Sequence, residues 1–269
     1  MGSVDVYIPE ARALRDRKTR YVWLGILFLA LYFISLIAAW VVFRSPLFKF
    51  KELRIEGNET VQKEDILMLY QSNMFRDSFF RYLLGYRNFL VWPEELTPEE
   101  LRQFPVIKRA ATEKDYGRGL LLIKVEERKA AGIWCGMQTE LPRCFWFDDE
   151  GVLFDKAPLV EGNLIRAVRD YASAEIYLGA RVLGKEQITN LLSVFQVFAR
   201  TGLSVKEISL SDLGLQELTI TTYEGPELYF SLRFKADDAA QVLDFLDQKP
   251  NFRKFEYVDF RVKDRVYYK

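Results

Sequence analysis

Residues 97–128 read TPEELRQFPVIKRAATEKDYGRGLLLIKVEER, and they hold the clearest run of secondary-structure signals in the chain. Thr97 is a candidate N-cap and Pro98 suits a first helical position, whereas Pro105 ends the helix because the residue before a proline resists helical geometry. Apolar and polar residues then alternate on both sides of a turn around Gly117, which predicts strands at about 107–115 and 119–127. The stretch therefore predicts a helix followed by a two-stranded hairpin.

Two further elements are predicted upstream. Alternation over Phe50–Glu56 predicts a short strand that ends at Gly57. Helical spacing of apolar residues predicts a helix over residues 61–71. The expected order over residues 44–128 is therefore strand, helix, helix, strand, strand.

Residues 72–91 are longer than a short connection between two helices needs to be. We expect an extra helical turn or two there. An apolar stripe at helical spacing usually faces the core, and contact with lipid or with a partner helix is the alternative. The stripe consists of Phe75, Phe79, Phe80, Leu83 and Leu84.

The segment Tyr21–Phe43, YVWLGILFLALYFISLIAAWVVF, contains no charged residue. As a helix it would reach about 34 Å, which is enough to cross a bilayer. The alternative is a signal peptide, whose apolar region spans only about 7–15 residues and precedes a small-residue cleavage site. This segment is longer and ends in bulky side chains, so we expect a transmembrane helix.

Basic residues ahead of this span set the expected orientation, because positive flanks stay in the cytoplasm. They are Arg12, Arg15, Arg17, Lys18 and Arg20. We therefore expect residues 1–20 to form a cytoplasmic tail and residues 44–269 to lie outside the cytoplasmic membrane.

Composition argues against several classes of function. Lys+Arg and Asp+Glu both number 38, so no net charge attracts the chain to nucleic acid, and 49% hydrophobic residues provide for a packed core. The chain has no histidine, which excludes Ser/His/Asp and Cys/His catalysis and removes the commonest metal ligand. No glycine-rich phosphate-binding motif occurs. We predict that the protein is not an enzyme and uses no cofactor, metal or small-molecule substrate.

Carboxylates at 148–150 and 126–127 are adjacent in sequence. Neighbouring residues of a strand point to opposite faces, so such pairs do not flank a scissile bond as acid and base. We interpret them as solvated turn and edge residues.

Residues 129–269 are expected to form a second α+β domain. The pattern predicts helices at 185–200 and 236–248 and strands near 205–211, 215–222 and 227–234, and the chain closes in one or more strands from Phe255 onward.

Four short motifs occur in a fixed order: FPVIKRA at Phe104–Ala110, VEER at Val125–Arg128 followed by Trp134, DDEGVLF at Asp148–Phe154, and YVDFR at Tyr257–Arg261. Together they resemble motifs of the bacterial cell-division proteins FtsQ and DivIB. Gly117-Arg118-Gly119 and Ala130 depart from this pattern, since the family usually has proline at both places. The long segment 72–91 departs from it as well.

The resemblance implies a fold and a function. The fold class would be α+β, with a single N-terminal transmembrane helix at 21–43, a POTRA domain of order β-α-α-β-β at 44–128, and a mixed FtsQ/DivIB-type β domain at 129–269 that ends in an exposed C-terminal strand. The protein would be a scaffold at the division septum that links early and late division proteins. Its partners would be FtsB- or DivIC-like and FtsL-like proteins, bound outside the cytoplasmic membrane.

The closing strand is the candidate binding site. Alternation places Val258, Phe260 and Val262 toward the core and Tyr257, Asp259 and Arg261 on the opposite face. If this strand borders the sheet, its backbone can accept a partner strand. The alternative is that Asp259 and Arg261 merely pair on the surface. Following the resemblance, we assign partner binding to Tyr257, Val258, Asp259, Phe260, Arg261, Val262, Val266 and Tyr267.

Cys135 and Cys144 flank a short predicted hairpin. Outside the cytoplasm they are expected to form a disulfide, with a reduced, buried pair as the alternative. Two cysteines without histidine supply too few ligands for a metal site.

Two other functions remain as hypotheses. A POTRA-containing secretion or envelope-assembly component would have a barrel or further POTRA repeats, which the sequence does not indicate. A membrane-anchored carboxylate hydrolase would bring two carboxyl groups within about 5–9 Å of each other in a cleft.

Overall fold

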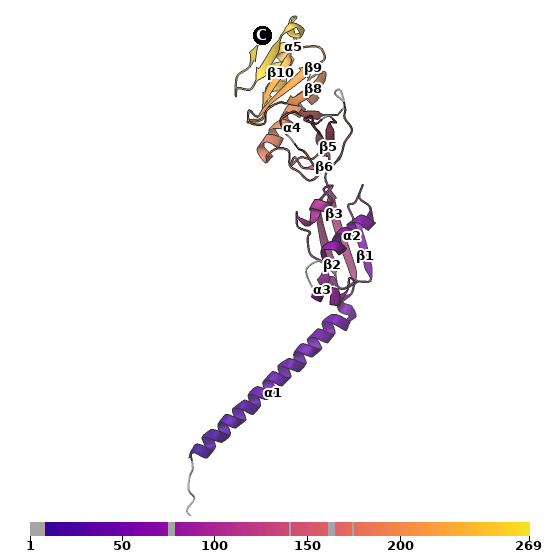
Figure 1. Ribbon diagram of the computed structural model, residues 1–269, viewed down its shortest axis with the longest axis vertical. Coiled ribbons are helices and arrows are strands. Elements are labelled where there is room, and N and C mark those ends of the chain that lie inside the picture. The colour runs from indigo at the N-terminus through magenta and orange to yellow at the C-terminus, as the bar shows by residue number, and fades with distance from the viewer. Residues whose placement is uncertain (1–8, 75–78, 140, 161–164, 174) are drawn as a thin grey trace, which may run out of the picture. The chain divides into compact units, whose positions relative to one another are not determined.

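The computed structural model describes residues 9–74, 79–139, 141–160, 165–173 and 175–269. Its first element, α1 (Pro9–Arg44), is a single long helix (Figure 1). Within α1, Arg20–Phe43 is long and apolar enough to cross a membrane. The predicted N-terminal apolar helix is therefore present.

The chain packs into two compact units. The first comprises the described residues up to Arg54 together with Gln71–Glu94 and Thr112–Ile123, and the second comprises Ile55–Tyr70, Glu95–Ala111 and Lys124–Lys269. The predicted domain boundaries at residues 44, 128 and 129 stay a prediction.

A three-stranded sheet has the order β1-β3-β2, with β1 at Glu52–Glu56, β2 at Ile107–Asp115 and β3 at Leu120–Glu127. All three strands lie where alternation predicts them. Alternate residues of β3 are buried, because a strand that covers a core points every second side chain inward. Helix α2 (Lys63–Met74) follows β1, and its inward side chains Ile66, Leu69, Tyr70 and Met74 are almost fully buried.

The predicted helix after Thr97 is instead a 3-10 turn, η3 (Glu100–Gln103). The residue at its N-cap is Glu99, which makes no side-chain cap hydrogen bond, so the prediction of Thr97 as the N-cap is wrong. Thr97 and Glu100 still bond to each other ahead of the turn: the Glu100 backbone N–H donates to the Thr97 hydroxyl oxygen at 3.4 Å, and the Glu100 carboxylate accepts the Thr97 N–H at 2.7 Å. Pro105 follows too soon for an α-helix to propagate, and a single tight turn is what such a short segment forms.

The extra helical turns expected in residues 72–91 are present as α3 (Phe79–Leu84) and η2 (Phe89–Val91). The expectation that the apolar stripe faces the core is wrong for Phe79 and Leu83, which are 75% and 55% exposed. Leu84 is half-buried. Phe75 and the side chain of Phe80 lie outside what the structure describes. The buried aromatic residues of the region are Phe89 and Trp92, which pack with Phe50.

The larger sheet has nine strands in the order β12-β11-β10-β9-β8-β7-β4-β5-β6. Their bounds are β4 Gly132–Gly136, β5 Arg143–Phe147, β6 Leu153–Lys156, β7 Ala167–Asp170, β8 Val205–Leu210, β9 Glu217–Thr222, β10 Glu227–Ser231, β11 Tyr257–Phe260 and β12 Tyr267–Tyr268. The sheet is mixed, since β4/β7, β7/β8 and β10/β11 are parallel while the other described pairs are antiparallel.

Helices α4 (Lys185–Arg200) and α5 (Ala239–Asp247) pack against this sheet (Figure 1). The inward face of α4 includes Ile188, Leu191 and Phe195, and it joins the strands in one hydrophobic core. Short 3-10 turns η1 (Pro46–Phe48) and η4 (Phe252–Lys254) complete the elements. A mixed α+β fold is therefore present, as predicted.

Three of the sequence motifs are joined through Arg128 in the second unit. The Arg128 guanidinium donates to the buried Asp148 carboxylate, and Arg128 also donates from Nε to the carbonyl oxygen of Pro105 at 3.0 Å. The other Asp148 oxygen accepts the backbone N–H groups of Glu150 and Val152 at 3.0 and 2.9 Å. Asp148 is thus a buried structural residue, which corrects its interpretation as a solvated turn residue.

Cys135 on β4 and Cys144 on β5 are opposite each other in an antiparallel pair. The structure joins them in a disulfide. Both side chains are buried in a small apolar cluster with Ile133.

Candidate protein-binding edge of the large sheet

The border of the large sheet is one strand further out than the sequence indicated. Strand β11, which holds the residues from Tyr257 to Phe260, pairs with β10 on one side and with β12 on the other. The premise that this strand borders the sheet is therefore wrong, and β12 is the terminal strand among those described. The reversal happens in residues 262–266, where Arg265 donates its N–H to the Val262 carbonyl at 3.2 Å and Asp264 takes a positive φ of 59°.

Strand β12 has two residues, Tyr267 and Tyr268, and Lys269 follows it. Lys269 faces β11 with both backbone groups, because its N–H donates to the Tyr257 carbonyl at 3.2 Å and its carbonyl accepts the Glu256 N–H at 2.6 Å. In an antiparallel ladder only alternate residues face the neighbouring strand. The N–H and C=O of Tyr268 therefore point away from β11, toward the position that an added strand would take.

One face of this edge carries tyrosines. The rings of Tyr229 and Tyr257 lie 5.9 Å apart, and the Arg261 guanidinium stacks 4.8 Å from the centre of the Tyr229 ring. Tyr267 is opposite Asp259 in the β11/β12 pairing, so it points to the same face. Its side chain is half-exposed at 47%.

Asp259 and Arg261 form the surface pair that the sequence offered as an alternative. Two nitrogens of Arg261 donate to the Asp259 carboxylate at 2.9 and 2.7 Å, and a third reaches Glu217 at 2.9 Å. Burial opposes ionisation of Asp259, but the hydrogen bonds from Arg261 outweigh it and lower the Asp259 pKa below its ordinary value of 3.8. These two charged groups are engaged within the protein, so the tyrosines are the side chains most available to a partner.

Alternation predicted three core-facing residues in and after β11, and two of them are buried. Val258 and Phe260 are buried, and the Phe260 ring stacks on Phe230 with centroids 4.8 Å apart. Val262 is 46% exposed because the strand ends at Phe260 and the chain begins to turn. Val266 is partly buried against the core. The prediction that Val262 meets the core is therefore wrong.

Tyr268 is a candidate residue that the sequence reasoning missed. It is opposite Val258, so it points to the helical side of the sheet, where its ring stacks on Phe255 with centroids 5.1 Å apart. Lys249 lies over the same ring at 4.7 Å and donates to its hydroxyl oxygen at 3.1 Å. Alternation next to Tyr267 was the available signal for Tyr268, whereas no local pattern connects Lys249 with the last residues of the chain.

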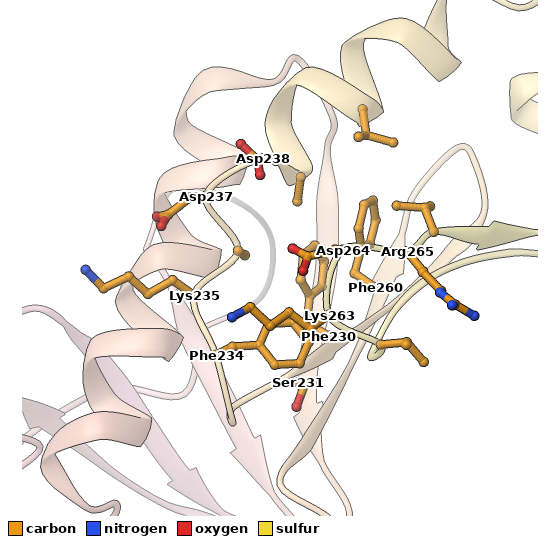
Figure 2. A pocket seen from close by; sticks show the side chains of 15 residues that line it. Phe230, Ser231, Phe234, Lys235, Asp237, Asp238, Phe260, Lys263, Asp264 and Arg265 are labelled. Atoms are coloured by element: carbon orange, nitrogen blue, oxygen red, sulfur yellow. The ribbon is translucent and has the colours of Figure 1, made fainter.

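A pocket of about 550 Å³ opens beside this edge, at the ends of β10 and β11 (Figure 2). Phe230, Phe260 and Val242 form an apolar part of its lining. Its charged residues, from the loops at either side, are Lys235, Asp237, Asp238, Lys263, Asp264 and Arg265. Three acidic and three basic side chains balance, so the pocket suits an apolar side chain of a partner better than a strongly charged one.

In the part of the chain that the structure describes, no group of three or more His, Cys, Asp or Glu side chains is placed to hold a metal ion. Comparison of the chain with models of known protein families and with curated proteins gave no match.

Proposed function

We propose that the protein is a membrane-anchored scaffold of the bacterial division site, similar in role to FtsQ and DivIB, that binds other division proteins and catalyses no reaction. The observation that carries this proposal is strand β12, a terminal strand of two residues that leaves the outward backbone groups of Tyr268 at the border of a nine-stranded sheet. Such a border is a template for the strand of another protein.

In this proposal α1 crosses the cytoplasmic membrane once, with the N-terminus in the cytoplasm and the folded part outside, at the septum. The basic residues ahead of Tyr21 support that orientation. The order of the four sequence motifs supports the assignment to division.

The partner would add a strand to β12. Its backbone would pair with the N–H and C=O of Tyr268, and its side chains would alternate between the tyrosine face at Tyr257 and Tyr267 and the helical side. An apolar side chain of the partner, close to the turn at residues 262–266, would enter the pocket lined by Phe230 and Phe260. FtsB- or DivIC-like proteins are the proposed strand donors, with FtsL-like proteins bound beside them.

The experiment measures affinity of the full chain in detergent for FtsB-like and FtsL-like ectodomains. A proline at position 268 removes the outward N–H, whereas alanine keeps it and removes only the ring. We expect Tyr268→Pro to weaken binding about tenfold or more and Tyr268→Ala to weaken it less, because losing a backbone pairing costs more than losing one ring contact. Tyr267→Asp should also weaken binding, through the tyrosine face.

Tyr223→Ala is the matched control, since Tyr223 is also an exposed tyrosine but lies after β9. Circular dichroism of each variant establishes that the fold is retained. Unchanged affinity of Tyr268→Pro would remove β12 from the mechanism. Binding to unrelated unfolded envelope proteins, without binding to the division ectodomains, would favour the envelope-assembly function instead.

A further inference from the structure

A cluster of exposed apolar side chains lies in the first compact unit, on and around α3. We name it the interfacial patch. Its members are Leu47, Phe79, Tyr82, Leu83, Tyr86 and Leu90, which are between 45% and 75% exposed. Five of the six come from residues 79–90, and such a concentration of exposed apolar side chains indicates an interaction site.

The patch is not the core-facing side of its own segment. Phe89 and Val91, which alternate with Leu90, are almost fully buried. Phe89 packs with Phe50 at 5.8 Å and with Tyr116 at 4.7 Å between ring centroids. The segment therefore supplies one set of side chains to the core and presents a second set outward.

Hydrogen bonds connect this segment to the end of the apolar helix and to the residues that follow it. The side-chain amide of Asn88, which is fully buried, donates to the carbonyl oxygen of Val42 at 3.3 Å. Phe50 donates its N–H to the Arg87 carbonyl at 3.0 Å, and Lys49 forms a bridge with Asn88. Val42 belongs to the last turn of the apolar stretch Arg20–Phe43, so Asn88 sets the patch at the level where that stretch ends.

The charged residues within the two stretches of chain that carry the patch are all basic. Residues 79–91 contain Arg81 and Arg87 and no acidic residue, and residues 44–51 contain Arg44, Lys49 and Lys51 and no acidic residue. Arg81, Arg87 and Lys49 are exposed. Aromatic rings interleaved with basic side chains are the composition that prefers the headgroup region of a bilayer, particularly one with anionic lipids.

We propose that the interfacial patch lies in the headgroup region of the bilayer that α1 crosses, and that Arg81, Arg87 and Lys49 hold anionic phospholipid there. This inference rests on the membrane anchoring in the proposed function. The chain would then contact the membrane through a transmembrane helix and through a second, surface-lying segment. That second contact would restrict the rotation of α1 about its own axis in the bilayer.

The experiment places an environment-sensitive fluorophore on a new cysteine in the full chain, reconstituted in vesicles of phosphatidylcholine with or without phosphatidylglycerol. The native cysteines are bonded to each other and do not react with the label. Leu83→Cys reports on the patch, and Leu215→Cys, similarly exposed at 57%, reports on a surface between β8 and β9. We expect lipid-borne nitroxide to quench the label at 83 about threefold more than the label at 215, and aqueous iodide to show the reverse order.

A double substitution tests the contribution of charge to lipid binding. Arg81→Gln/Arg87→Gln in the Leu83→Cys background should abolish the additional lipid quenching produced by phosphatidylglycerol, because the attraction to anionic headgroups depends on those two guanidinium groups. Equal iodide access at 83 and 215 would overturn the inference. A label at 83 that is shielded from iodide but not quenched by lipid, with shielding that disappears on dilution of the protein in lipid, would show a second copy as the occupant and would also overturn it.

Phe33→Cys separates this inference from the proposed anchoring. A label within the apolar stretch must be quenched by a nitroxide placed deep in the acyl chains. If it is not, the anchor itself fails. If it is, and the label at 83 behaves as aqueous, the interfacial patch alone fails.

Discussion

Glu127 connects the end of β3 to the turn that precedes α2. Its carboxylate accepts the backbone N–H groups of Glu59, Thr60 and Val61 at 2.8–3.0 Å, and also the Thr60 hydroxyl. Burial opposes ionisation of Glu127, but these hydrogen bonds outweigh it and lower the Glu127 pKa below its ordinary value of 4.5. The ionised carboxylate is therefore part of the folded structure.

Glu127→Gln should lower the free energy of unfolding at pH 7 by about 1–3 kcal/mol, because an amide oxygen is a weaker acceptor than a carboxylate. A pKa lowered by folding contributes stability above pH 4.5 that is lost as the pH falls through the folded value. The difference in the free energy of unfolding between parent and variant should therefore shrink as the pH falls below 4.5. Denaturant unfolding at several pH values measures it, with the exposed neighbour Glu126→Gln as control. Equal stability of Glu127→Gln and parent at pH 7 would refute the role.

Gly151 is required by the turn that Asp148 organises. It has a φ of +77°, and a Cβ there would lie 2.6 Å from Cγ1 of Ile188 in α4. Gly151→Ala should cost about 1–3 kcal/mol, because it combines an unfavourable backbone conformation with overpacking. Gly202→Ala is the control, since no atom lies within 4 Å of its Cβ position, and it should leave stability unchanged or raise it by up to about 1 kcal/mol. Thermal unfolding distinguishes the two, and equal effects would contradict the argument.

At the scale of elements, local patterns located the strands of the small sheet. β1, β2 and β3 and the helix α4 are all where alternation or helical spacing predicts them, because each buries one face against a core. Glu100–Gln103 was predicted as an α-helix and is a 3-10 turn. The segment between Pro98 and Pro105 is too short for an α-helix, and this short length decides its geometry. Which strand borders the large sheet was mispredicted as well. That property depends on pairing between residues distant in sequence, such as β10 with β11, which alternation does not encode.

The pair formed by Arg128 and Asp148 joins the end of β3 to the turn between β5 and β6. The two side chains are only 14% and 1% exposed. Removing one partner of a buried ion pair leaves a charge without compensation, whereas removing both charges costs much less. The pair therefore has a larger effect on stability than the exposed ion pairs nearby.

Arg128→Met should lower the free energy of unfolding by about 3–5 kcal/mol. The double variant Arg128→Met/Asp148→Asn should recover roughly half of that loss, because the neutral amide oxygen can still accept the backbone N–H groups of the turn. Lys108→Met is the control. Lys108 contacts Asp149 at 3.3 Å in a pair whose acid is 69% exposed, so its loss should cost less than about 1 kcal/mol. A double variant as unstable as Arg128→Met would show that the loss of stability comes from lost packing of the Arg128 side chain and not from the unpaired charge.

At the scale of the whole molecule, the two proposed contacts belong to different compact units. The interfacial patch lies in the unit that contains α1, and β12 lies in the unit that contains the large sheet. The sequence indicated an anchor and a closing strand, but it did not separate the exposed side chains around α3 from core residues. Helical spacing alone is the same for a stripe that faces a core and for one that faces a membrane.

Because the two contacts share no residue and belong to separate units, we expect their energetics to be additive. Four full-length proteins in vesicles test this: parent, Arg81→Gln/Arg87→Gln, Tyr268→Pro, and the combination. Partner affinity should respond only to the change at Tyr268 and lipid quenching at position 83 only to the arginine changes, with a coupling free energy below about 0.5 kcal/mol. If loss of the two arginines weakened partner binding as much as Tyr268→Pro does, the partner would have to contact the membrane-proximal unit too, and β12 would be only part of its binding site.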